Sequence, residues 1–131
     1  FPFGRITLTI AHHGSGLPTD DGIIYLGNPC GFVVNLEDKN IYHAGDTGLF
    51  YDMKLIGELY PLDLALLPIG SNFTMGVREA VKAVELLSPK YAIPMHFDTF
   101  DVIKQDPQEF VSQLPGSVKG IVLKVGESYE L

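Results

Sequence analysis

Alternating apolar and polar positions dominate the first third of the chain. Residues 6–10 alternate in this way and are rich in β-branched side chains, which predicts a strand. Residues 23–26, 32–36 and 41–44 show shorter runs of the same kind. The polar segment 37–40 separates the last two runs and has the composition of a hairpin turn. The first third is therefore predicted to be mostly β-structure.

The period of the apolar residues changes to a helical one further along the chain. Residues 53–59 carry apolar side chains at helical spacing, with Asp52 as the expected N-cap. Residues 76–87 form the clearest amphipathic helix, because their apolar side chains follow the i, i+3, i+4, i+7 pattern. A third helix is expected to begin with Asp106 as N-cap and Pro107 in the first turn.

Strands are expected between and after these helices. Residues 64–67 are almost continuously apolar, which predicts a strand buried on both faces. Residues 91–93 form a short strand that Pro94 is expected to end. Residues 118–125 read as a last long strand, followed by a turn and a short tail strand. Strands and helices therefore alternate in the second half, so the fold class is α/β (α+β) in a single domain over residues 1–131.

Composition and net charge limit the classes of protein to which the chain can belong. The chain has 131 residues, 9 Lys and Arg, 16 Asp and Glu, and a formal net charge of −7. An acidic chain without a basic cluster repels phosphate backbones, so a nucleic-acid partner is not expected. No apolar run approaches a membrane span, and we expect a cytoplasmic location. With Cys30 as its single cysteine, the chain can form no intrachain disulfide.

Three polar residues follow predicted strands at points where the chain must turn. His13, Asp46 and His96 each lie close to a glycine or proline just past a strand end. Active sites of α/β sheets are built from such strand ends, and imidazole together with carboxylate suits Zn²⁺, Fe²⁺ or Mn²⁺. A histidine at a strand end is also frequently a hydrogen-bonded structural residue, and the spacing alone leaves both interpretations open.

Other candidate side chains have simpler interpretations. His12 neighbours His13 on a strand and points to the opposite face, which favours a packed or exposed bystander. His43 is interpreted as a hydrogen-bonded strand residue more than a ligand, and Cys30 as a buried small hydrophobic residue more than a nucleophile. Thr47 is expected to hydrogen-bond near the turn at Asp46.

Five segments occur in a characteristic order: 11–15 (AHHGS), 27–32 (GNPCGF), 42–50 (YHAGDTGLF), 67–76 (LPIGSNFTMG) and 93–97 (IPMHF). Their most specific part is His-Ala-Gly-Asp-Thr followed later by Pro-Met-His. Together the segments closely resemble the uncharacterised metal-dependent hydrolase family of the metallo-β-lactamase superfamily, and the resemblance covers nearly the whole chain.

The resemblance implies roles for the three strand-end residues. His13 and His96 resemble metal-binding histidines of the superfamily, and Asp46 resembles its metal-bridging aspartate. The implied catalytic residues are Asp46 and His96, and the implied cofactor is a divalent metal: zinc, or else manganese or iron. The implied fold is the C-terminal half of a four-layer αββα sandwich. The implied reaction is attack by a metal-bound hydroxide on an ester, lactone or phosphoester.

The chain departs from the family pattern in two respects. The His-x-His-x-Asp-His motif of the N-terminal half is absent. Ser71 stands where an aspartate is expected, and Asp98 stands where an amide is more usual. If the expected aspartate helps to orient a ligand, its replacement by serine weakens that support.

Two functional hypotheses follow. In the first, the chain is part of a metal-dependent hydrolase of a small-molecule substrate, and its site is completed by an N-terminal half. In the second, it is a catalytically incomplete fragment that acts as a binding or structural subunit. Either way half a sandwich leaves one sheet face uncovered, which predicts a homo-oligomer or pairing with the N-terminal half. A nuclease is disfavoured by the charge of −7.

Overall fold

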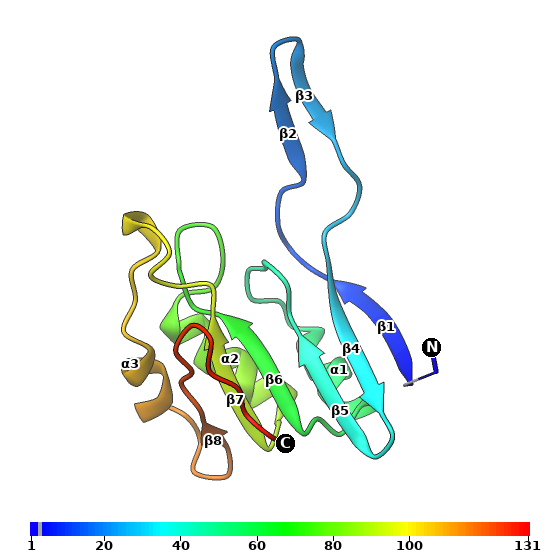
Figure 1. Ribbon diagram of the computed structural model, residues 1–131, viewed down its shortest axis with the longest axis vertical. Helices are drawn as coiled ribbons and strands as arrows, with labels where there is room; N and C mark the ends of the chain where they lie inside the picture. The colour runs from blue at the N-terminus through cyan, green and yellow to red at the C-terminus, as the bar shows by residue number, and fades with distance from the viewer. Residues whose placement is uncertain (3) are drawn as a thin grey trace.

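The computed structural model describes residues 1–2 and 4–131, which form one main sheet, a separate hairpin and three α-helices (Figure 1). The strands are β1 (Arg5–Ile10), β2 (Gly16–Thr19), β3 (Gly22–Tyr25), β4 (Cys30–Leu36), β5 (Lys39–His43), β6 (Leu64–Pro68), β7 (Tyr91–Met95) and β8 (Lys119–Gly120). The helices are α1 (Met53–Leu59), α2 (Val77–Leu87) and α3 (Pro107–Ser112), with a 3₁₀ turn at Asp101–Ile103. Within the described residues no helix has the length and apolar character that a membrane crossing requires.

The main sheet has six strands in the order β1-β4-β5-β6-β7-β8 (Figure 1). The first three strands pair antiparallel, and β5, β6, β7 and β8 pair parallel. The segments that follow β5, β6 and β7 therefore leave the sheet at the same edge. Sites in α/β sheets form at this edge, which places the ends of these three strands at the centre of the functional question.

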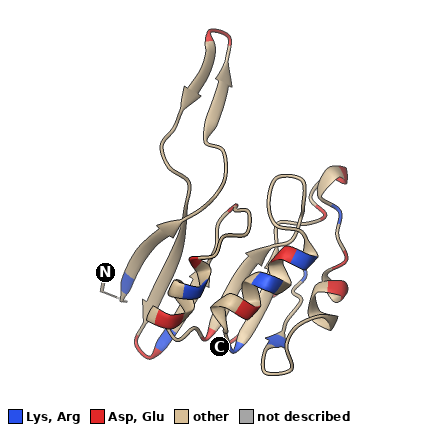
Figure 2. Cartoon of the chain, turned by 180° about the vertical axis from the view of Figure 1, so that it is seen from behind, with Lys and Arg blue, Asp and Glu red and all other residues tan. Residues whose placement is uncertain are grey.

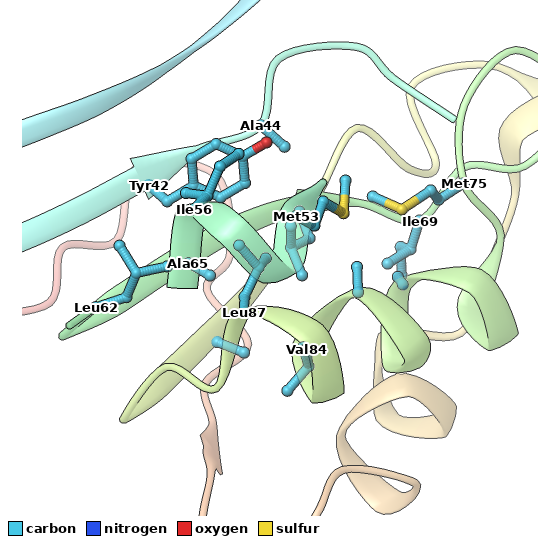
Figure 3. Packing of buried hydrophobic residues seen from close by; sticks show 14 of the residues in the cluster. Tyr42, Ala44, Met53, Ile56, Leu62, Ala65, Ile69, Met75, Val84 and Leu87 are labelled. Carbon is cyan, nitrogen blue, oxygen red and sulfur yellow. The ribbon is translucent and has the colours of Figure 1, made fainter. Parts of the chain in front are cut away.

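One face of the sheet carries the core. Val33, Tyr42, Ala65 and Ala92 lie side by side on adjacent strands and are fully buried. Helices α1 and α2 cover this face, as the opposite views in Figures 1 and 2 show. Their buried side chains, including Met53, pack against it (Figure 3). Burial raises the pKa of Tyr42 to about 12, so this core tyrosine stays neutral throughout the physiological range.

The opposite face of the sheet is apolar but uncovered near β1. Ile6, Leu8 and Ile10 alternate with the residues that share the helix-covered side, and they are 37%, 66% and 58% exposed. At the other end of this face the C-terminal tail approaches the sheet, where Tyr129 lies 5.8 Å from the ring of Tyr91. The sequence-based expectation of an uncovered sheet face is thus met at its β1 end.

Most predicted elements appear where the periodicity placed them. Helix α2 occupies the predicted amphipathic segment, and α3 begins as expected, because Asp106 Oδ1 accepts a 2.8 Å hydrogen bond from the Gln108 N–H. The expected cap of α1 is wrong. Asp52 precedes the helix in a helical conformation, and its side chain makes no capping hydrogen bond to any described residue. A capping residue needs an extended backbone to turn its side chain toward the first amides, and Asp52 lacks it.

The long strand predicted over 118–125 is also wrong, because only Lys119–Gly120 pairs with the sheet. In β7, every second residue directs both its backbone N–H and its C=O toward β8. Ala92 is one of these residues, because its carbonyl accepts a hydrogen bond from the Ile121 N–H. Continuing the ladder requires the next such amide, at Pro94, which has no N–H to donate. Residues 121–131 form no strand. Pro94 itself stays inside β7, contrary to the expectation that it ends the strand.

A hairpin projects from the sheet, and the sequence pattern predicts only its second strand, at 23–26. Residues 12–16 read as a glycine-rich loop, yet Gly16–Thr19 forms β2 and pairs with β3. All residues of β2 are exposed, so no buried face created a detectable period-2 pattern there. We call the hairpin of residues 16–25 the arm (Figure 1).

A buried carboxylate ties together the starts of the parallel strands. Asp63 is 5% exposed and accepts hydrogen bonds from the Asn40 N–H (2.9 Å) and from Lys90 Nζ (2.8 Å). Its backbone also bonds Asn40 and Tyr91. Burial by itself raises the pKa of Asp63, but the hydrogen bonds from Lys90 and Asn40 and the charges of Lys90 and Lys39 outweigh burial and hold it below its ordinary value.

This lowered pKa makes Asp63 a source of acid sensitivity. Its contribution to stability is fully present above the ordinary carboxyl pKa of about 3.9 and is lost as the pH falls through its own lower value. We expect Asp63→Asn to unfold at lower urea concentration than the wild type at pH 7, and the difference to shrink between pH 4 and pH 2. Urea unfolding across that range tests this. A difference that stays constant with pH would contradict the assignment.

Candidate metal centre at the ends of β5, β6 and β7

Asp46 and His96 come together at the sheet edge where the parallel strands end. Asp46 follows β5 and His96 follows β7, with β6 between them. His96 Nε2 lies 3.5 Å from Asp46 Oδ2. Their side chains are 28% and 46% exposed, so the pair is open to solvent and to a ligand. Two of the three residues predicted from the strand ends are therefore neighbours in the folded chain.

Glycines allow this close arrangement. His96 has a positive φ of 54°, which turns the chain sharply after β7. A Cβ on Gly70, at the end of β6, would lie 2.3 Å from the His96 carbonyl oxygen and 3.2 Å from its Nδ1. Gly45 has a φ of 65°, and a Cβ on this residue would lie 2.6 Å from the Cys30 carbonyl oxygen. Only glycine leaves room for the backbone at both positions.

The remaining nitrogen of His96, Nδ1, is buried. His96 Nδ1 has no hydrogen-bond partner in the described part of the chain. A histidine that binds a metal through one nitrogen usually donates its other N–H to an oxygen that fixes the ring. In this structure Gly70 lies beside this nitrogen and leaves room for the ring, since a Cβ on Gly70 would be 3.2 Å from Nδ1.

Thr47 connects the loop of Asp46 to two other loops. Its hydroxyl accepts a 2.8 Å hydrogen bond from the His12 N–H and donates one of 2.8 Å to the Gly48 carbonyl. Its own carbonyl accepts from the Met75 N–H at 3.0 Å. The side chain is fully buried. The predicted hydrogen-bonding role of Thr47 is confirmed, and its reach, across loops 12–15 and 71–75, was not visible in the sequence.

His13 lies on a neighbouring part of this rim. Its Nδ1 bonds the Gly14 carbonyl oxygen at 2.8 Å, and its side chain lines a surface pocket together with Ile10, Tyr25 and Asn28. The described residues contain no group of three or more His, Cys, Asp or Glu side chains placed to hold one metal ion. The structure thus joins Asp46 with His96 and does not bring His13 into the same cluster.

His12 and His43 take the roles expected of them. His12 stacks on Phe50, with ring centroids 5.1 Å apart and planes at 4°. His43 Nδ1 accepts a hydrogen bond from the Gly45 N–H at 3.1 Å. Asp98 Oδ1 accepts a 3.0 Å hydrogen bond from the Gln105 N–H, and this bond helps to shape the loop after His96.

The Asp46–His96 pair fits a divalent metal. A carboxylate oxygen and an imidazole nitrogen are common zinc ligands, and two donors each about 2.0–2.2 Å from a tetrahedral zinc ion lie roughly 3.3–3.5 Å apart. The observed 3.5 Å matches that separation. Manganese and iron accept the same donor types. The pair supplies two donors, so further ligands are needed for a complete site.

Comparison with known proteins shows the family of the chain. A family model described as the beta-lactamase superfamily domain matches residues 1–97, a range that includes Asp46 and His96. The chain belongs to the beta-lactamase superfamily. It is 56% identical over 131 residues to a protein of Listeria monocytogenes serotype 4a named UPF0173 metal-dependent hydrolase. A protein of the same family name from Pelotomaculum thermopropionicum is 55% identical over 130 residues.

Solved structures of two other hydrolases are similar to this chain. Igni18, a metallo hydrolase from the archaeon Ignicoccus hospitalis, superimposes with a TM-score of 0.82 at 42% identity, over 96% of this chain and 52% of that one. The isothiocyanate hydrolase from Delia radicum gut bacteria superimposes with a TM-score of 0.74 at 20% identity, over 96% of this chain and 53% of that one, and so shows the fold alone. The mixed α/β fold with the metallo-β-lactamase arrangement is thereby established. The chain spans 58% of the length of its Listeria relative.

Proposed function

We propose that this chain supplies Asp46 and His96 to the metal site of a hydrolase that cleaves an ester, lactone or phosphoester bond in a small molecule. The observation that carries the proposal is the 3.5 Å approach of Asp46 Oδ2 to His96 Nε2 at the ends of two parallel strands. The names of the relatives, which are metal-dependent hydrolases, support it.

The proposed roles follow from the surroundings of each side chain. His96 offers Nε2 at a ring orientation set by Gly70, and Asp46 offers a carboxylate whose second oxygen can accept a proton from a water molecule. His13 is proposed as a third ligand, reached when its loop, which the His12 N–H bonds to Thr47, meets the rest of the site. A divalent metal held by these residues, which we expect to be zinc, would lower the pKa of water and polarise the bond to be cleaved.

The rest of the site is proposed to come from an N-terminal half that packs against the uncovered sheet face. The curated relatives are longer than this chain, which spans 58% of the Listeria protein. Helices cover one face of the sheet, and Leu8 and Ile10 leave the other face apolar and exposed. A second sheet on that face would bury this surface and complete an αββα sandwich, of which residues 1–131 would form the C-terminal half.

A second candidate function is a binding or structural subunit without catalysis. The observation that favours it is the lack, among the described residues, of three side chains that converge on one ion. The two functions differ in what the N-terminal half does when it binds: it either completes a metal site or only covers the sheet.

Metal content and hydrolysis together test the proposed function. We would measure zinc, manganese and iron per chain by mass spectrometry, and hydrolysis of p-nitrophenyl acetate and bis-p-nitrophenyl phosphate. Both are measured with and without the N-terminal segment of the Listeria relative. His96→Ala is compared with His12→Ala, a matched histidine that stacks on Phe50.

We expect the combined halves to bind metal and hydrolyse one probe, with both properties lost in His96→Ala and kept in His12→Ala. A complex that forms without metal or hydrolysis would overturn the enzyme and support the structural subunit. Metal that binds equally well to His96→Ala would show that the ion lies elsewhere.

A further inference from the structure

The arm exposes apolar side chains on both of its faces. Ile23, Ile24 and Tyr25 of β3 are 79%, 52% and 67% exposed. Its strands belong to a separate two-stranded sheet that extends beyond the main sheet (Figure 1). A two-stranded hairpin is marginally stable in water without a partner for its apolar surface. The composition of the arm therefore indicates that another surface covers it.

The two edges of the arm are not equivalent. The Leu26 N–H bonds the Ser15 carbonyl at 3.0 Å, one position beyond the ladder. Since hydrogen-bonded and non-bonded pairs alternate along an antiparallel ladder, Leu17 and Ile24 also form a bonded pair. Ile23 and Tyr25 consequently direct their backbone N–H and C=O groups away from β2.

The outer edge of β2 is blocked and that of β3 is open. The residue of β2 opposite Ile23 is Pro18, which has no N–H to offer on its outward side. Residues 22–25 contain no proline and no charge. An uncharged, β-branched and aromatic edge with free backbone groups is a template for pairing with another strand. The edge open to a partner is thus β3.

We propose that β3 pairs antiparallel with β3 of a second copy of this chain, about a two-fold axis at Ile24. In this register Ile23 exchanges backbone hydrogen bonds with Tyr25 of the second copy, and Tyr25 does the same with Ile23. The two Ile24 residues face each other in the non-bonded pair on the axis. The result is one four-stranded sheet, β2-β3-β3-β2, shared by two molecules.

Side chains and charge favour a second copy as the occupant. Ile23 would lie beside an aromatic Tyr25, a pairing that stabilises sheets, and Ile24 would meet its own equivalent. The only charges in the arm are Asp20 and Asp21 at its tip (Figure 2). Antiparallel pairing puts the two acidic tips at opposite ends of the shared sheet, so molecules that each carry −7 can join there without opposing these charges.

A disulfide on the axis tests the register directly. In a Cys30→Ser background, Ile24→Cys is compared with Ile23→Cys, a matched variant one position away. Facing residues of a non-bonded pair have Cα atoms about 4.5 Å apart, within disulfide range, whereas Ile23 and its own equivalent would be about 8 Å apart and on the other face. We expect air oxidation to convert most of Ile24→Cys into a covalent dimer and to leave Ile23→Cys largely monomeric on non-reducing gels. Equal cross-linking of both variants, or of neither, would overturn the register.

Sedimentation velocity shows whether the wild-type chain forms a dimer. Two lysine variants then show whether that dimer forms through the arm or through the open sheet face. Ile24→Lys places two like charges on the axis and is expected to weaken the dimer at least about tenfold. Leu8→Lys, the same kind of change at an exposed residue of β1, is expected to leave the dimer intact. A dimer lost in Leu8→Lys and kept in Ile24→Lys would assign the interface to the sheet face. A wild type that is monomeric at all concentrations, or an Ile24→Lys change that weakens only binding of the N-terminal segment, would likewise overturn the proposal.

Discussion

Gly70→Ala is expected to lower the zinc affinity of the proposed metal centre by about 10- to 100-fold, the range typical of changes just behind a ligand. The new Cβ would lie 2.3 Å from the His96 carbonyl oxygen and 3.2 Å from its Nδ1. Neither β6 nor the turn after β7 can move far, because Ile69 N–H bonds the Met95 carbonyl at 3.0 Å. The strain therefore falls on the position of the His96 ring.

Zinc titration of the chain combined with the N-terminal segment measures this effect. The His96 ring resonances in NMR spectra of the chain alone provide a second readout that needs no metal. Gly48→Ala is the control, since a Cβ there meets only the His12 carbonyl, at 3.9 Å. Unchanged affinity and unchanged His96 resonances in Gly70→Ala would show that Gly70 does not set the ring. Equal losses in both variants would point to a general loosening of the loops.

The elements that were predicted correctly are those whose sequence pattern has one dominant cause. Helix α2 has a continuous apolar stripe that packs on the sheet, so its periodicity and its position agree. Helix α3 has a local start signal, Asp106, that acts without tertiary help. Asp52 shows the limit of such signals, because the turn before α1 leaves it helical and unable to cap.

The errors in the predicted strands arose where the extent or presence of a strand is not determined by its own segment. The extent of β8 is set by Pro94 on β7, which offers no amide for the next bond, and the apolar run over 121–125 contains no trace of this. The strand β2 was missed because its residues are exposed and include Gly16 and Pro18, which are unusual in strands. Neither the short length of β8 nor the presence of β2 follows from the periodicity of its own segment.

The candidate site likewise combines features that the local sequence predicts with features that only tertiary contacts set. Asp46 and His96 were predicted because each follows a strand in a parallel sheet, and strand ends converge by topology. The room for His96 comes from Gly70, a residue 26 positions earlier whose closeness to His96 is a tertiary fact. The assignment of His13 as a ligand remains a prediction. Its loop is held to the Asp46 loop by Thr47, whose hydroxyl accepts a hydrogen bond from the His12 N–H.

Gly57→Ala is expected to destabilise the chain by up to about 2 kcal/mol, although alanine is the better helix former. In an open helix this change gains about 1 kcal/mol. Gly57 lies in α1 against the end of α2, and a Cβ there would be 2.4 Å from the Leu87 carbonyl oxygen and 2.9 Å from its Cα. These are backbone atoms, so relief requires the two helices to separate and to loosen the core around Leu87. Overpacking of this kind costs about 1–3 kcal/mol and occasionally more, which exceeds the gain in propensity.

Urea unfolding followed by circular dichroism measures the balance between propensity and packing at Gly57. Gly116→Ala provides the same chemical change where a Cβ meets nothing within 4 Å, and it is expected to be neutral or slightly stabilising. A Gly57→Ala chain more stable than the wild type would mean that α1 can shift away from α2 at little cost. Helix packing would then be loose on the covered face of the sheet, and the position of the β5 end that carries Asp46 would have to be fixed by the strands and by Thr47 alone.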